Sequence, residues 1–114
     1  MSIDFSEVSD RLKAESNHLA RYYELVEAKL KTAAIGLEAW VDLGPGLEIG
    51  YAKCAGKWQL SLRRGKSFQE PLCSTSRIVR MLAVSKIPEL EAALLRSAGE
   101  HADEIQRILE GLLP

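Results

Sequence analysis

The sequence predicts one α+β domain over residues 1–114, in which a long N-terminal helix, a short helix and a long C-terminal helix pack on one face of a three-stranded antiparallel β-meander. Three observations favour this fold class. Apolar residues recur at helical spacing near both ends of the chain, strand-like alternation fills the middle, and a Gly-Pro-Gly break separates two expected strands. The expected segments are a helix over 1–36, the meander and a loop over 37–73, and a helical hairpin or kinked helix over 74–114.

A seven-residue repeat of apolar residues indicates the first helix. Its members are Phe5, Leu12, Leu19, Val26 and Ala33. Asp4 with Glu7 three residues later is typical of a capping box, although Ser2 or Ser6 could cap the helix instead. Gly36 is the expected stop. A helix of some 30 residues would be about 45 Å long, which is more than a small sheet can cover, so part of it is expected to pack on another chain.

Two charged residues occupy intervening seam positions, between the members of this seven-residue repeat. Glu15 and Lys29 stand where a strict two-stranded coiled coil would have leucine. The stripe could pack against the last helix and the sheet of the same chain, or against a partner that uses the same stripe, and the two arrangements can coexist. A homodimer through helical surface is therefore expected.

The centre of the meander is expected to be a β-hairpin. Residues 47–53 and 58–64 alternate apolar and polar residues, and Trp58 falls on the apolar face. In the short loop between them, Gly56 is expected to take a positive φ. Because an isolated hairpin is marginally stable in water, the flanking helices are expected to cover its apolar face.

The strands on either side of this hairpin are less clearly marked. Residues 37–43 are expected to form the first strand, with Trp40 on the opposite side of the sheet, where a neighbouring loop or a partner would cover it. Residues 65–70 are expected to form either a loop or a short fourth strand.

Two helices are expected after the sheet. A serine or threonine within 74–76 can cap a short helix, which ends at Ile87 because the following proline disfavours helix there. Pro88 suits the first turn of the last helix, which is expected to reach Leu112. The long stripe of that helix makes it the expected partner of the first helix.

Charge is segregated along the chain, although the formal net charge is only −1. Residues 1–48 carry −4, residues 49–86 carry +7, and residues 87–114 carry −4. A converging set of cations would bind phosphates or an acidic protein, whereas pairing with the acidic helices would leave an ordinary solvated surface. The candidate binding residues are Lys53, Lys57, Arg63, Arg64, Lys66, Arg77, Arg80 and Lys86.

No motif points to catalysis. The sequence lacks a glycine-rich phosphate loop and a nucleophile elbow, and it holds two histidines. The pattern nearest to a metal site is Glu15-x-x-His18 with His101-x-x-Glu104, but the second pair reverses the order that di-iron helical bundles use. No metal or cofactor is therefore expected.

Cysteine usage and hydropathy bear on the compartment. Cys54 and Cys73 lack metal-ligand spacing and are expected to be free thiols in a reducing compartment. The sequence contains no apolar run of membrane-spanning length, and its polar, acidic N-terminus lacks the features of a signal peptide. A cytoplasmic location without membrane partners is expected.

These features favour a non-enzymatic protein-interaction module, such as a small bacterial or phage-type adaptor, chaperone or inhibitor. Its expected contact surface combines the basic hairpin with Arg77 and Arg80, and its expected partners are a second copy and an acidic protein. The alternative is a nucleic-acid-binding accessory protein that uses the same basic surface.

Overall fold

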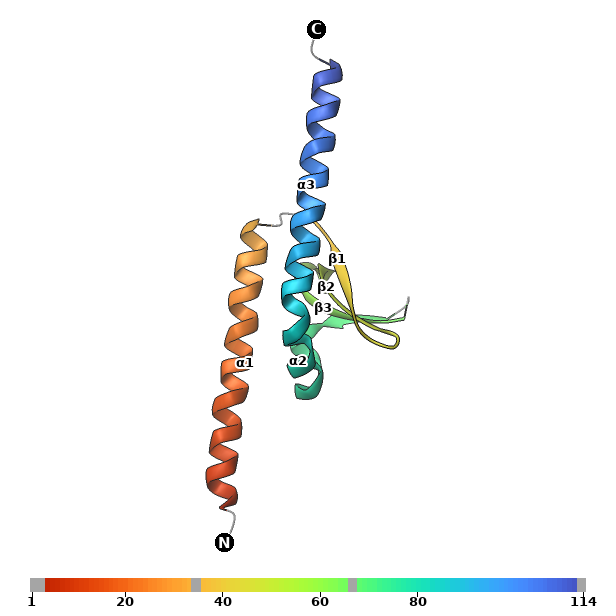
Figure 1. Cartoon of the computed structure of the whole chain (residues 1–114). Helices are drawn as coiled ribbons and strands as arrows, with labels where there is room; N and C mark the ends of the chain where they lie inside the picture. Colours follow the sequence, from red (N-terminus) through yellow and green to blue (C-terminus); the bar gives the residue numbers. More distant parts are fainter. Residues whose placement is uncertain (1–3, 34–35, 66–67, 113–114) are drawn as a thin grey trace.

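A computed structural model describes residues 4–33, 36–65 and 68–112 (Figure 1). The α+β class and the order of helices and sheet are as predicted. The elements are α1 (Phe5–Ala33), β1 (Ala39–Gly44), β2 (Leu47–Cys54), β3 (Lys57–Arg64), β4 (Phe68–Pro71), the 3-10 turn η1 (Leu72–Ser74), α2 (Arg77–Ala83), the 3-10 turn η2 (Val84–Lys86) and α3 (Ile87–Leu112).

The sheet is antiparallel in the order β1-β2-β3-β4, with one strand more than the predicted meander. Of the two alternatives for residues 65–70, the fourth strand is the correct one, since Phe68 lies opposite Arg64 and Pro71 opposite Ser61. Proline has no N–H to donate to a ladder, which suits the end of an edge strand.

The β2–β3 turn is tighter than the short loop predicted between residues 53 and 58. Its two residues, Ala55 and Gly56, both have positive φ, at 52° and 82°. That combination is typical of a type I′ turn, whose twist matches the right-handed twist of the flanking strands. The positive φ predicted for Gly56 is confirmed, and the strands extend to Cys54 and Lys57.

Helix ends follow the expected capping chemistry. Asp4 Oδ1 accepts hydrogen bonds from the N–H groups of Ser6 at 2.9 Å and Glu7 at 3.4 Å, so Asp4 is the cap among the alternatives. Ser76 caps α2, and its side chain accepts a hydrogen bond from the Val79 N–H at 3.3 Å.

The core lies between the helices and one face of the sheet, as predicted. Tyr51 shows how tightly this face is closed, since it is 1% exposed. Trp58 lies on the same face, with its ring centroid 5.7 Å from that of Tyr51, but it is only half-buried at the turn end of the hairpin. The buried members of the core are Tyr23, Val26, Leu30, Ile49, Tyr51, Leu60, Leu62, Leu72, Ala83, Ile87, Leu90 and Leu94.

The two long helices run in the same direction but are staggered, which gives the molecule its extents of 80 × 27 × 24 Å (Figure 1). The second half of α1 lies beside the first half of α3, and Lys29 Nζ lies 2.8 Å from Glu91 Oε2. Beyond this region α1 extends in one direction and α3 in the other. We call residues 5–18 the α1 overhang and residues 99–112 the α3 overhang; every residue in them is exposed except Ser16, which is half-buried.

On the second face of the sheet, the packing of Trp40 requires a glycine in the neighbouring strand. Gly50 lies opposite Trp40 in the β1–β2 ladder, and the indole lies directly on the glycine backbone. A Cβ at this position would be 2.5 Å from Trp40 Cδ2 and closer still to the carbonyl oxygen of Ala39. Because the oxygen belongs to the backbone of a paired strand, it cannot move away without breaking the ladder.

We therefore expect Gly50→Ala to lower the free energy of unfolding by about 1–3 kcal/mol, the usual cost of overpacking a closed site. The measurement is urea denaturation followed by circular dichroism. Gly44→Ala is the matched control, since a Cβ there would meet nothing within 4 Å, and it should change stability little. Equal effects from the two substitutions would contradict the steric explanation.

Candidate interaction surfaces

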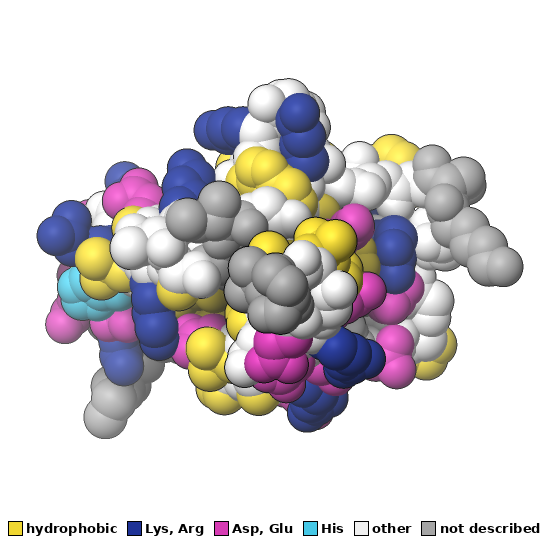
Figure 2. Space-filling model, turned by 90° about the horizontal axis from the view of Figure 1, so that it is seen from above, with side chains coloured by type: hydrophobic (Ala, Val, Ile, Leu, Met, Phe, Trp, Pro, Cys, Tyr) yellow, Lys and Arg dark blue, Asp and Glu magenta, His cyan; other side chains and the backbone are white. Residues whose placement is uncertain are grey.

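The cations predicted to form one binding surface lie at several separate places. Along β3 the turn and the far strand end are about 23 Å apart, at about 3.3 Å per residue. On the face shown in Figure 2, Lys and Arg side chains are spread around the outline with Asp and Glu between them. Lys53 and Lys57 flank the β2–β3 turn, Arg63 and Arg64 end β3, Arg77 and Arg80 lie on α2, Lys86 ends η2, and Lys66 falls outside the described residues.

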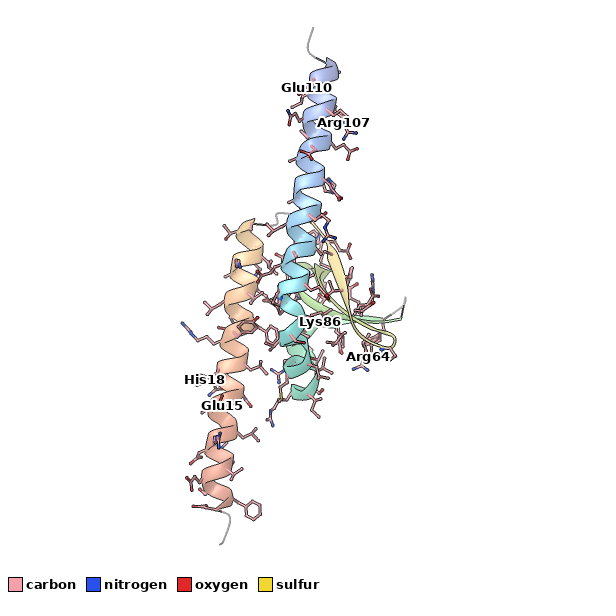
Figure 3. The ribbon with its side chains drawn as sticks, viewed as in Figure 1. Glu15, His18, Arg64, Lys86, Arg107 and Glu110 are labelled. Carbon is pink, nitrogen blue, oxygen red and sulfur yellow. The ribbon has the colours of Figure 1, made fainter. Side chains whose placement is uncertain are left out.

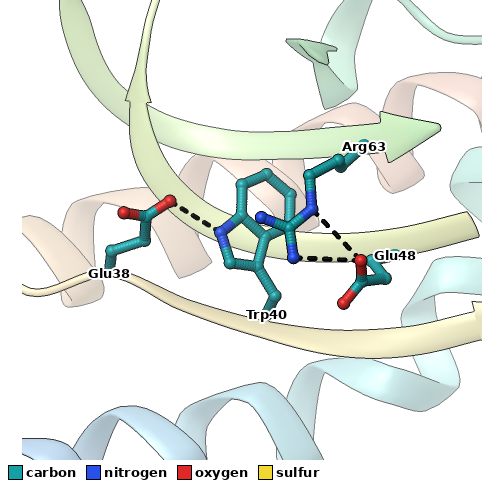
Figure 4. Close-up of polar contacts among 4 residues, drawn as sticks. All are labelled: Glu38, Trp40, Glu48 and Arg63. Carbon is teal, nitrogen blue, oxygen red and sulfur yellow. Dashed lines mark hydrogen bonds and ion pairs between the residues drawn. The ribbon is translucent and has the colours of Figure 1, made fainter. Parts of the chain in front are cut away.

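Arg63 is engaged within the sheet (Figure 4). Its Nη2 and Nε donate to Glu48 Oε1 at 2.9 and 3.1 Å, and its Cζ lies 4.2 Å from the centroid of the Trp40 ring. The indole Nε1 in turn donates to Glu38 Oε1 at 2.7 Å. Trp40 is thus covered by an arginine of another strand, and neither the predicted loop nor a partner is needed to cover it.

Two further cations have acidic neighbours. Lys86 Nζ lies 3.8 Å from Glu89 Oε2, and Arg80 lines a pocket that Glu24 and Glu27 also line. The remaining described cations make no ion pair with other described residues, and their role in binding stays a prediction. They are Lys53, Lys57, Arg64 and Arg77.

Large apolar side chains are exposed on both overhangs. Phe5, Val8 and Leu12 are between 47% and 83% exposed on α1, and they continue the helix face that is buried further along at Val26. On α3 the exposed residues are Ile105, Ile108, Leu109 and Leu112. We call Phe5, Val8, Leu12 and Leu19 the α1 stripe, and Ala98, Ile105, Ile108 and Leu112 the α3 stripe.

The prediction that α3 packs against α1 and the sheet is right for its first half only. Ile87, Leu90 and Leu94 are buried, whereas the apolar residues beyond Ala98 extend past the sheet and are exposed. The apolar spacing identified the correct face of the helix. It carried no information about where along the helix axis the contact ends.

A groove lies between the first half of α1 and α2. Its volume is about 240 Å³, and one of its lining residues, Ser16, has an Oγ that is buried without a hydrogen-bond partner among the described residues. Met81, which lines the groove from α2, has an exposed side chain. Its lining residues are Leu12, Glu15, Ser16, Leu19, Arg77 and Met81.

Tyr23 fixes α2 beside α1 and so sets the shape of this groove. Its hydroxyl donates a hydrogen bond to the backbone carbonyl oxygen of Arg80, and the edge of its ring packs on Tyr22 at a centroid distance of 5.3 Å. Burial raises the pKa of Tyr23 well above its usual value, with Tyr22 adding to the shift and Arg80 opposing it.

The two Glu/His pairs do not meet. Glu15 and His18 lie on the α1 overhang (Figure 3), with His18 Nδ1 3.8 Å from Glu15 Oε2, whereas His101 and Glu104 lie on the α3 overhang at the other end of the molecule. Within residues 4–33, 36–65 and 68–112, no three His, Cys, Asp or Glu side chains are grouped so that they could hold a metal ion.

Replacing the Tyr23 hydroxyl tests the anchor. We expect Tyr23→Phe to lower the free energy of unfolding by about 1 kcal/mol at pH 7, the usual contribution of one buried hydrogen bond. Tyr22→Phe is the control, since the Tyr22 hydroxyl bonds to none of the residues described, and it should change stability little. Thermal unfolding followed by circular dichroism measures both.

The same residue should make stability fall in alkali. Because the pKa of Tyr23 is raised in the folded state, the folded protein holds the phenolic proton more tightly than the unfolded chain does. The resulting stability is complete below the usual tyrosine pKa of about 10 and is lost as pH rises above it. Tyr23→Phe should reduce this loss between about pH 10 and 11 without removing it, because the pKa values of Tyr22 and Tyr51 are raised as well. An unchanged slope would contradict the assignment.

Among the residues described, none of the helices is both long enough and apolar enough to span a bilayer. Comparison with models of known protein families, with curated proteins and with solved structures finds no match to this chain.

Proposed function

We propose that the protein is a non-enzymatic protein-interaction module of the adaptor type, which self-associates and binds helical protein segments through the α1 and α3 stripes. One observation carries this proposal: large apolar side chains follow one another at helical spacing on the two overhangs, where they are exposed. Contiguous exposed apolar surface of this kind marks interaction sites in soluble proteins.

The energy available from such contacts is substantial. Burying one large aliphatic or aromatic side chain completely contributes about 1.5–3 kcal/mol, and each exposed stripe residue has roughly half of that left to gain. A helix segment of some 14 residues is also only marginally stable in water by itself. Association would therefore stabilise the helical conformation of the overhangs as well as cover their apolar side chains.

The cations without ion pairs support a second contact, with an acidic protein surface. Lys53 and Lys57 lie on either side of a two-residue turn at the end of the hairpin, where both are exposed. The same pair would also suit phosphate groups, so nucleic-acid binding is the second candidate function.

Substitution of the α3 stripe tests the proposed function. We expect Ile105→Lys to weaken concentration-dependent association in sedimentation velocity by about tenfold or more, because a lysine ammonium would have to be desolvated in the contact. Gln106→Lys adds the same charge one residue away and off the stripe, so it should leave association intact. The proposal fails if the unmodified protein stays at the 12.6 kDa mass of one chain at every concentration, or if both variants behave alike.

The second candidate function predicts binding of labelled DNA or RNA at low salt, with affinity falling as salt rises by a slope of about 0.9 per phosphate contacted. Lys53→Glu with Lys57→Glu should reduce that slope by about two. The control, Arg21→Glu with Arg96→Glu, changes the same charge at exposed helix positions. Lack of binding in fluorescence polarisation at low salt would exclude nucleic acid and leave an acidic protein as the partner class.

A further inference from the structure

The two overhangs are matched in length and opposite in direction. Each comprises 14 residues, which corresponds to about 21 Å of helix, and they leave the body at its two ends (Figure 1). A second copy turned by 180° about an axis perpendicular to the helices would place its α1 overhang beside the α3 overhang of the first copy. The same rotation would bring the other two overhangs together.

The stripes also match in the order of their residues. Counted from the helix terminus that points away from the sheet, both overhangs begin with three large apolar residues at spacings of three and four. A polar residue comes next, and an apolar residue follows it where the helix reaches the sheet. From the free end, α1 presents Phe5, Val8, Leu12, Glu15 and Leu19, and α3 presents Leu112, Ile108, Ile105, His101 and Ala98.

We propose that each α3 overhang lies antiparallel in the α1–α2 groove of a second copy, so that two identical contacts form one closed, two-fold symmetric dimer. This inference rests on the proposed function and specifies its partner. The groove presents the face of α1 that packs beside α3 within each chain, so the dimer contact continues an existing interface. Closure follows from the two-fold axis, because one operation covers all four overhangs.

In the antiparallel register neither stripe sets a charged residue against an apolar residue of the other. Leu12 meets Ile105 of the partner subunit, and Phe5 meets the partner's Leu112. The polar positions coincide as well, since the partner's His101 comes beside Glu15 and Ser16. An imidazole there can bond to the Glu15 carboxylate.

A parallel, head-to-tail arrangement fits the same residues less well. It would set Glu15 against the partner's Ile108 and Val8 against the partner's His101, so that one carboxylate is buried without a partner. Such a contact is also heterologous, and it would add copies without closing. Pairing like overhangs, α1 with α1, would leave both α3 stripes uncovered in a dimer.

Charge exchange across the contact tests this pairing. We expect Leu12→Glu alone and Ile105→Lys alone each to raise the dimer dissociation constant by about tenfold or more, since each leaves a charge unpaired in an apolar contact. The double variant should regain most of the affinity, because each introduced carboxylate would then face an introduced ammonium group of the other copy. Light scattering with size-exclusion chromatography measures the mass, and circular dichroism checks that the helices remain.

Two comparisons make the outcome decisive. Asn17→Glu with Gln106→Lys carries the same charges off the stripes and should keep twice the 12.6 kDa chain mass. If the single variants dissociate and the double variant does not recover, the reciprocal pairing is wrong while association through the overhangs stands. If neither single variant alters the mass, the proposed function itself fails.

Disulfide trapping distinguishes a closed dimer from an open chain of copies. In a background with Cys73→Ser, which removes the exposed native thiol, Leu12→Cys and Ile105→Cys should oxidise to one covalent dimer on a non-reducing gel. A ladder of higher species would establish head-to-tail association and overturn the two-fold arrangement, as would the absence of any crosslink between copies.

Discussion

Strand length limits how much of each helix the sheet can cover. β2 and β3 have eight residues each, about 26 Å, whereas the 29 residues of α1 and the 26 of α3 correspond to about 44 and 39 Å. The two helices are staggered along their axes instead of lying level over the sheet. As a result, only about half of the apolar face of each helix is packed. The α1 and α3 stripes follow from this mismatch, because the helical pattern continues after the sheet has ended.

The sheet itself leaves little for another element to cover. On its second face the buried side chains are small or bonded locally, as in Ser61, whose Oγ donates to the Gln59 carbonyl oxygen. The sheet curls enough for Gln69 Nε2 to reach the carbonyl oxygen of Lys53 at 3.4 Å. Leu60 lies in β3 just beyond the residues that pair with β4, and its backbone N–H donates a hydrogen bond to Glu27 Oε1 at 3.2 Å. This bond satisfies one backbone donor that β4 leaves unpaired, so a further strand is less readily added at this position.

Periodicity in the sequence predicted most of the fold because each element has its own pattern. It could not decide the fourth strand, since Phe68–Pro71 is too short to show alternation and ends in proline. It also could not pair Arg63 with Glu48 and Trp40, because that contact depends on the register of three strands. Nearness in sequence was a poor guide to the eight candidate cations, since strands and helices carry neighbouring residues far apart. The apolar stripes could be identified in the sequence, but the stagger of α1 and α3 along their axes could not.

On the proposed function, the small size of the overhang contact determines which partners could replace the second copy. Each stripe offers three large exposed side chains and one inner apolar residue, so a helix with the same spacing could replace the partner copy without any change in the body. Overhang order and association are coupled, because a free helix end of this length frays in water. On the proposed function, self-association therefore keeps the stripes covered and helical until a competing helix is present. The polar pair of Glu15 and His101 would then select among competitors, since an apolar residue at that position leaves the carboxylate unpaired.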